Sequence, residues 1–223
     1  MRSKCFFIIF VVFYSLQAQV DWYRLNDNPV FTTGALGSWE SSHVLGPEVK
    51  YIDGEYKMWY SGLLGAYVSE IGLATSPDGI TWTRESSNPV IAKGPYGTWD
   101  DYSISGATIV YKDSTYHAWY AGDDSVHLSI GYAISSDGIT WQKYANNPVM
   151  APAGNANWTP LYIWSGTVLV IDSVFHMWYS GQSANSVLQI GHATSTDGIE
   201  WSQDTANPVL RVGASGTIDG RSM

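Results

Sequence analysis

The chain has 223 residues, of which 45% are hydrophobic and 14% are charged, a composition that excludes a charge-rich disordered protein. Its formal net charge of −9 offers no basic surface to phosphate backbones, so we expect no nucleic-acid binding. The 22 glycines, 11 tryptophans and 15 tyrosines favour short strands joined by tight turns, and we therefore expect an all-β fold.

The first eighteen residues have the features of a secretory signal peptide. Two basic residues precede an apolar run at 6–14, which is too short to span a bilayer as a helix. We expect cleavage after Ala18, and hence a secreted, periplasmic or cell-surface protein with no membrane span. The one cysteine, Cys5, lies in this segment, so the domain at residues 19–223 is expected to have no disulfide.

The rest of the chain is built from internal repeats. The triplet Asn-Pro-Val occurs at 28–30, 88–90, 147–149 and 207–209. Two longer motifs keep the same spacing: Met58–Gly62 returns at 118–122 and 177–181, and Ser76–Trp82 returns at 135–141 and 195–201. Such self-similarity indicates repeated supersecondary units, here near 28–87, 88–146 and 147–206, with an incomplete unit at 207–223.

Each repeat predicts four short antiparallel strands. In the first repeat the strands are expected at 45–51, 55–61, 71–75 and 81–84, with Asp-Gly turns after the first and third. Repeated four-stranded units describe the blades of a β-propeller.

Three blades and partial strands are fewer than the roughly four to eight blades of a closed propeller. Residues 22–24 match 82–84 and predict an additional fourth strand, whereas residues 213–219 match 94–100. We therefore expect a five-bladed parent protein with about 100 further residues.

Two segments of the first repeat resemble the five-bladed β-propeller glycosidases. They run from Gly46 to Gly62, which contains Asp53-Gly54-Glu55-Tyr56-Lys57-Met58-Trp59-Tyr60-Ser61-Gly62, and from Ile71 to Trp82. This superfamily includes arabinanases, β-xylosidases, invertases, levansucrases and mannoside phosphorylases. The resemblance implies a glycoside hydrolase that acts on oligosaccharides or polysaccharides with carboxylates on the innermost strands. The Ser-x-Asp-Gly-x-x-Trp turn is also similar to the sialidase Asp-box, so a sialidase-like propeller is a further alternative.

Residues present in every repeat are expected to serve the scaffold. The turn aspartates should bond within their turns, and one tryptophan of each second strand should pack between blades. These residues are Asp78, Asp137 and Asp197, and Trp59, Trp119 and Trp178.

Glu48 and Asp101 occur in one repeat each and are the candidate catalytic residues. Glu48, with Thr108 and Val168 as its expected counterparts, lies near the start of an inner strand, where partial desolvation would raise the pKa of a carboxyl group. Asp101 precedes the next inner strand. The alternative to a catalytic role is, for Glu48, a carboxylate that accepts hydrogen bonds from neighbouring strand ends and, for Asp101, a solvated loop aspartate.

Further polar residues lie near the same expected opening. Asp100 is a candidate substrate-binding residue, although Glu40 and Asp219 take its place in other repeats, which favours a structural turn. Asp123 and Asp124 lie in the loop between the second and third strands and could reach a substrate or a cation.

Four other residues are candidates for carbohydrate binding. Trp164, whose expected counterparts are Val44 and Ile104, could stack against a sugar ring, and the others are His43, Tyr102 and Tyr162. A lone histidine is weak evidence for a metal site, and we expect neither a metal nor a cofactor.

The sequence departs from the resembled superfamily at one catalytic position. Its members usually have Asp-Pro early in the first inner strand, whereas this chain has Gly46 there, with Gly106 and Gly166 as expected counterparts. The base is then Asp101, Glu48 or a residue beyond Met223, or else the propeller is a non-catalytic carbohydrate-binding or interaction module. Carbohydrate is the expected partner for both the hydrolase and the carbohydrate-binding module.

Overall fold

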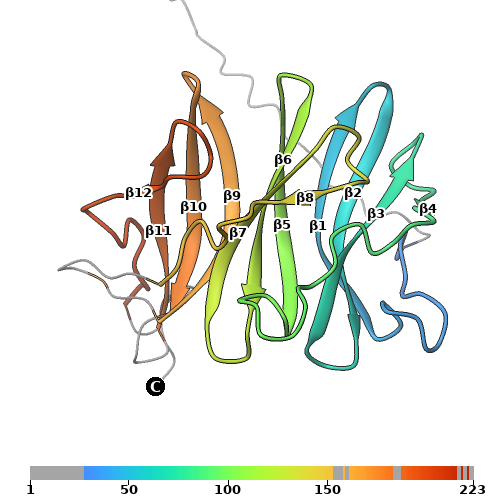
Figure 1. Cartoon of the computed structure of the whole chain (residues 1–223), viewed down its shortest axis with the longest axis horizontal. Helices are drawn as coiled ribbons and strands as arrows, with labels where there is room; N and C mark the ends of the chain where they lie inside the picture. Colours follow the sequence, from blue (N-terminus) through green and yellow to red (C-terminus); the bar gives the residue numbers. More distant parts are fainter. Residues whose placement is uncertain are drawn as a thin grey trace, which may run out of the picture.

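The structure is a computed structural model that describes residues 28–152, 158, 161–182, 187–214, 217 and 220 (Figure 1). The expected signal peptide, the expected strand at 22–24 and Asp219 lie outside the described residues. Every regular element within those residues is a β-strand, and the strands form three four-stranded antiparallel sheets. This part of the chain contains no helix long and apolar enough to cross a membrane.

Each sheet is one sequence repeat, and its four strands lie in chain order. The first sheet contains β1 (His43–Ile52), β2 (Glu55–Leu64), β3 (Val68–Ser76) and β4 (Thr83–Arg84). The second contains β5 (Ser103–Lys112), β6 (Thr115–Asp123), β7 (Leu128–Ser135) and β8 (Gln142–Lys143). The third contains β9 (Tyr162–Ile171), β10 (Val174–Gln182), β11 (Leu188–Ser195) and β12 (Ser202–Gln203). The prediction of an all-β fold made of four-stranded blades is confirmed.

The fourth strand of each blade is shorter than the sequence predicts, because the turn before it takes up part of the segment. In the first blade Asp78 Oδ1 accepts hydrogen bonds from the backbone N–H groups of Ile80 and Thr81, at 2.8 and 2.7 Å. The same two bonds form at Asp137 and Asp197. These bonds lower the pKa of Asp78 to about 2, and they confirm the structural role predicted for the turn aspartates.

The blades pack through the repeated tryptophans. Trp59 Nε1 donates to the backbone oxygen of Gly138 in the second blade at 3.0 Å, and Trp119 Nε1 donates to that of Gly198 in the third at 2.7 Å. Both indoles are buried in apolar clusters that join adjacent blades. The predicted packing role of these two tryptophans is therefore confirmed, whereas Trp178 is half-buried on the last blade.

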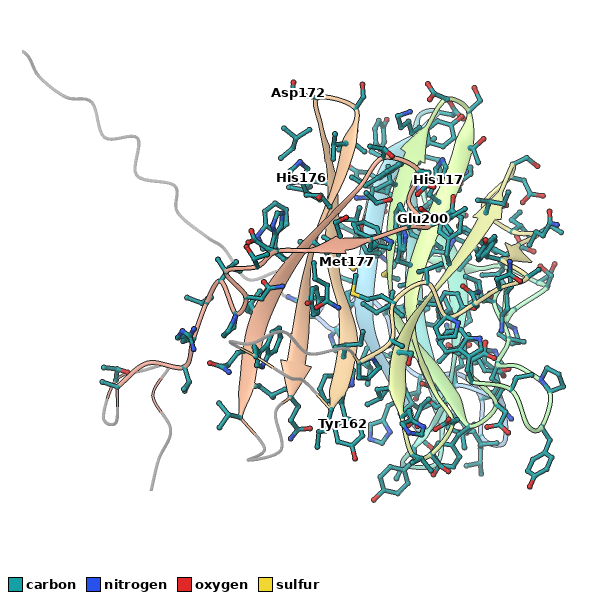
Figure 2. All side chains as sticks on the ribbon, turned by 60° about the vertical axis from the view of Figure 1, so that its left-hand side comes forward. His117, Tyr162, Asp172, His176, Met177 and Glu200 are labelled. Atoms are coloured by element: carbon teal, nitrogen blue, oxygen red, sulfur yellow. The ribbon has the colours of Figure 1, made fainter. Side chains whose placement is uncertain are left out.

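The first strands of the blades begin at one common end. In Figure 1 the β1–β2 and β5–β6 hairpins lie at the top, and the β2–β3 and β6–β7 loops lie at the bottom. We name the lower end, where β1, β5 and β9 begin, the mouth end. Figure 2 shows Tyr162 at this end of β9 and Asp172 at the opposite end.

The register of β9 corrects one alignment made from the sequence. Trp164 pairs with Ser180, just as Leu45 pairs with Ser61 in the first blade. The counterparts of Trp164 are therefore Leu45 and Ser105, not Val44 and Ile104. The error arose because the Asn-Pro-Val triplet before the third blade comes 59 rather than 60 residues after the preceding one.

Candidate active site

A cavity of about 570 Å³ opens at the mouth end of the second blade. Its volume lies in the range of small-molecule sites. We name it the mouth cavity, and its lining residues are Tyr96, Gly97, Thr98, Trp99, Asp101, Tyr102, Asp124 and Ser125. The structure therefore brings together three residues predicted from the sequence, Asp101, Tyr102 and Asp124.

Asp101 both shapes and lines the mouth cavity. Its Oδ2 atom accepts a hydrogen bond from the backbone N–H of Gly97 at 2.6 Å, and its backbone oxygen accepts one from Lys93 Nζ at 2.5 Å. These bonds hold the loop before β5 in place, and the carboxylate stays half-buried. Asp101 is thus a positioned carboxylate rather than a freely solvated one.

Asp123, at the end of β6, directly precedes the lining residue Asp124 and is not itself among the lining residues. Its backbone oxygen accepts the N–H of Tyr102 at 3.0 Å, which ties it to the start of β5. Burial raises the pKa of Asp123, and the negative charges of Asp124 and Asp101 raise it further, against the effect of a hydrogen bond from the backbone N–H of Ser125. A carboxyl group that keeps its proton more readily is suited to general-acid catalysis.

The pKa of the neighbouring Asp124 is shifted in the opposite direction. Burial acts to raise the pKa of Asp124, but hydrogen bonds from His127 and Val126 outweigh it and lower the pKa. His127 Nδ1 also lies 3.1 Å from Asp124 Oδ2. The pKa values of these two adjacent carboxyl groups are thus shifted in opposite directions, as they are in pairs of carboxyl groups that serve as acid and base.

Glu48 lies on β1 of the first blade and is not among the residues lining the mouth cavity. Its side chain is 28% exposed, and Oε1 is 2.8 Å from Lys50 Nζ. The strand register makes Thr108 and Thr167 its counterparts, not Thr108 and Val168 as the sequence alignment predicted. Glu48 therefore remains the one carboxylate at this position, in a different blade from Asp101.

The inner strands explain the glycine found where the resembled superfamily has aspartate. Gly46 and Gly106 have φ values of +59° and +61° at equivalent bulges in β1 and β5, a conformation that favours glycine. Ser61 Oγ accepts the N–H of Gly106 at 3.0 Å and ties the first blade to the second. In β9 the register aligns these two glycines with residue 165 rather than with Gly166.

The remaining predicted binding residues are spread along the mouth end. Tyr162 and Trp164 are half-buried on β9, with ring centroids 6.3 Å apart, and present two aromatic surfaces in the third blade. His43 is exposed at the start of β1 and is the register equivalent of Tyr162. The mouth cavity includes none of these three residues.

Asp100 does not have the exposure expected of a substrate-binding residue. It is 2% exposed, and its carboxylate is 2.6 Å from Lys143 Nζ and also accepts a bond from Thr98. Glu40 and Arg84 make the equivalent ion pair in the first blade, at 2.6 Å. Asp100 is a structural residue, in line with the alternative that its repetition suggested.

Sequence reasoning did not select Tyr96, which is fully exposed at the rim of the mouth cavity. Leu36 takes its place in the first repeat, so comparison of the repeats could have marked it as distinctive. Within the described ranges, no group of three or more histidine, cysteine, aspartate or glutamate side chains is placed to hold a metal ion.

Comparison with known sequences adds distant relatives, and no family model matches the chain. The chain is 28% identical over 186 residues to an uncharacterized protein of Mycobacterium tuberculosis, covering 78% of this chain and 59% of that protein. It is 30% identical over 144 residues to the A type blood N-acetyl-alpha-D-galactosamine deacetylase of Flavonifractor plautii, covering 53% of this chain and 18% of the enzyme. The chain thus spans less than two thirds of the length of these relatives.

Comparison with solved structures identifies the fold. One similar structure comes from a study of mannoside phosphorylases of glycoside hydrolase family 130, a family that contains hydrolases targeting beta-1,2 mannosidic linkages in Candida mannan. The TM-score is 0.66 at 22% identity, and the match covers 86% of this chain and 62% of the other. The chain therefore has the blade architecture of propeller glycoside hydrolases, as its sequence resemblance predicted.

Proposed function

We propose that this chain is a secreted glycoside hydrolase-like propeller that acts on glycosidic bonds of oligosaccharides or polysaccharides. The observation that carries the proposal is the mouth cavity, where Asp101 and Asp124 line the wall beside Asp123, whose pKa is raised. The fold likeness supports carbohydrate as the substrate class, although fold alone does not specify a reaction.

In the proposed reaction, Asp123 donates its proton to the glycosidic oxygen as the bond from that oxygen to the anomeric carbon breaks. An ionised carboxylate, Asp124 or Asp101, accepts a proton from the water that attacks the anomeric carbon. The products are two shorter sugars, and the two carboxyl groups return to their starting protonation by exchange with solvent.

The aromatic side chains of the mouth end would position the substrate. The rings of Tyr96 and Tyr102 stand at the mouth cavity and can pack against the C–H faces of a sugar. Tyr162, Trp164 and His43 lie at the starts of the inner strands of the other blades, and would contact additional sugar units of a longer chain.

The test uses the full chain and a panel of mannose-, arabinose-, xylose- and galactose-containing oligosaccharides. New reducing ends and released sugar phosphates are measured with and without inorganic phosphate, because the solved relative's family includes phosphorylases as well as hydrolases. Asp123→Asn should lower turnover roughly 100-fold or more while sugar binding stays measurable. Asp113→Asn, a matched exposed aspartate on the β5–β6 hairpin, should keep full activity. Unchanged turnover by Asp123→Asn would refute the assignment.

Glu48 provides a rival assignment that the same assay separates. If Glu48 supplies the essential carboxylate, Glu48→Gln abolishes turnover with binding retained, and Asp123→Asn does not. Full activity of Glu48→Gln excludes Glu48 as a catalytic residue.

A non-catalytic carbohydrate-binding propeller is the second candidate function. The observation in its favour is the glycine at the bulge of β1, where the resembled superfamily carries a catalytic aspartate. This function predicts that the wild-type chain binds members of a glycan array and releases no product from any of them.

A further inference from the structure

A second cavity, of about 660 Å³, lies on the outer side of the second blade. One wall is the segment at 90–95, which follows the first blade, and another is the segment at 141–147, which contains β8 at the sheet edge farthest from β5. We name it the outer cavity. Thr98 and Trp99 line both this cavity and the mouth cavity, so the loop at 94–101 separates the two.

Two residues that line the outer cavity, Lys93 and Tyr144, occur in the second repeat alone. Their counterparts in the other repeats are Thr33, Pro152 and Val212 for Lys93, and Glu85 and Asp204 for Tyr144. The indoles of Trp99 and Trp141 behind them recur in the other repeats and belong to the scaffold. The comparison of repeats that singled out Asp101 at the mouth end therefore also singles out Lys93 and Tyr144 on the outer side.

The first repeat shows how side chains fill the equivalent space. Arg84, the register equivalent of Lys143, lies 4.2 Å from the ring centroid of Phe31 and donates to the backbone oxygen of Thr32. In the second repeat Ile91 takes the place of Phe31, and it is 2% exposed. The smaller pair of side chains leaves a cavity where the arginine and the phenylalanine pack together in the first repeat.

The charged groups available to a ligand in the outer cavity are hydrogen-bond donors. Lys143 Nζ is 2.6 Å from Asp100 Oδ2, and the two side chains are 30% and 3% exposed, so the ligand meets the ammonium group rather than the carboxylate. Lys93 is exposed, and its Nζ donates to the backbone oxygen of Asp101 at 2.5 Å. Because an ammonium group has three donors, each of these bonds leaves donors for a ligand.

Two further acidic groups lie near Lys93 but do not line the outer cavity. Glu70 Oε1 accepts the backbone N–H of Lys93 at 3.1 Å, and Asp101 Oδ2 accepts that of Gly97 at 2.6 Å. Both carboxylates are thus bound to backbone groups rather than to the Lys93 ammonium group. The cavity therefore offers two ammonium groups and one shielded carboxylate, which favours a ligand with a negative charge.

We propose that the outer cavity binds a uronic acid, a sugar whose terminal carbon is a carboxylate. Lys93 would pair with that carboxylate, Lys143 would donate to a neighbouring sugar oxygen, and the half-buried ring of Tyr144 would pack against the C–H face. The choice of a sugar rests on the proposed function, because the ammonium groups by themselves select only an anion. A longer oligosaccharide would place its acidic unit here and another unit in the mouth cavity across the shared wall.

The test is isothermal titration calorimetry of the full chain with digalacturonate and with the galactobiose of the same linkage, two ligands that differ in their carboxylates. The wild type should bind digalacturonate more tightly, and added salt should weaken this binding. Lys93→Gln should weaken it by roughly 10-fold or more, because one charge-assisted pair is lost, whereas Lys93→Arg should retain it. Lys112→Gln, a lysine on the β5–β6 hairpin, is the matched control and should bind as the wild type does.

Tyr144→Ala should also weaken digalacturonate binding, and this residue makes no contact with the loop that carries Asp101 among the hydrogen bonds described above. Equal affinity of the wild type for the two disaccharides would overturn the proposal, as would binding that both Lys93→Gln and Tyr144→Ala leave unchanged. Loss of binding in Tyr102→Ala alone would place the acid in the mouth cavity and overturn it as well.

The same titrations separate this inference from the proposed reaction. Asp123→Asn should bind digalacturonate as the wild type does, whether or not the wild type cleaves any oligosaccharide of the panel. A wild type that cleaves a neutral oligosaccharide but does not bind digalacturonate would overturn the uronic acid site and leave the proposed function intact.

Discussion

The bond between Trp119 and Gly198 gives a direct measure of how strongly two blades hold together. Trp119→Phe retains an aromatic ring but removes the N–H group. Because Trp201 Nε1 still donates to the Gly198 oxygen at 3.1 Å, one of two hydrogen bonds to that oxygen is lost, at a cost of about 0.5–1.5 kcal/mol. Trp119→Ala removes the ring as well, including its contacts with Phe175 and Trp201, and should lower the free energy of unfolding by about 3–5 kcal/mol.

Urea unfolding followed by backbone circular dichroism measures the loss of unfolding free energy in both variants, because this signal does not rely on the fluorescence of Trp119. Leu36→Ala, at a fully exposed side chain, is the control and should change the free energy of unfolding by less than about 0.5 kcal/mol. If the free energy of unfolding of Trp119→Phe lies within about 0.5 kcal/mol of the wild-type value, with an unchanged dependence on urea concentration, the indole bond does not stabilise the contact between blades.

Three further predictions follow from the turns and from the start of the chain. Hydrogen bonds outweigh burial and lower the pKa of Asp137 from 3.8 to about 2. The contribution of its carboxylate to stability is therefore present above about pH 4 and is lost as the pH falls toward 2. Asp137→Asn should reduce this loss of stability in unfolding measured as a function of pH. Gly138→Ala should destabilise the chain more than Gly79→Ala, because both glycines have a positive φ but only Gly138 lies against Trp59; equal losses in thermal melts would contradict this packing. N-terminal sequencing of the exported protein should begin at Gln19, and an uncleaved start would argue against the signal peptide.

The repeats made the scaffold predictable. The turn aspartates occur in three equivalent contexts, so local hydrogen-bonding rules applied at Asp78 also hold at Asp137 and Asp197. The tryptophan of the second strand packs between blades in two of the three repeats, at Trp59 and Trp119. Strand ends were less predictable, since the turn bonds to Ile80 and Thr81 take up residues whose pattern also suits a strand.

The site was only partly predictable, because its chemistry depends on segments that the fold brings together. Asp101 and Tyr102 could be selected from their position before an inner strand. The raised pKa of Asp123 depends on burial and on charges from two different loops, which spacing along the chain does not reveal. For Asp100 the recurrence of an acid in other repeats favoured a structural role, but its partner Lys143, in a strand 43 residues away, could not be identified from the sequence.

The central claim is that the mouth cavity of the second blade binds a sugar. A crystal structure of the full chain with an oligosaccharide selected from the panel tests this claim most directly. We predict a sugar ring between Tyr96 and Tyr102, with a glycosidic oxygen within hydrogen-bonding distance of Asp123. A sugar found only on Tyr162 and Trp164 of the third blade, with the mouth cavity empty, would contradict it.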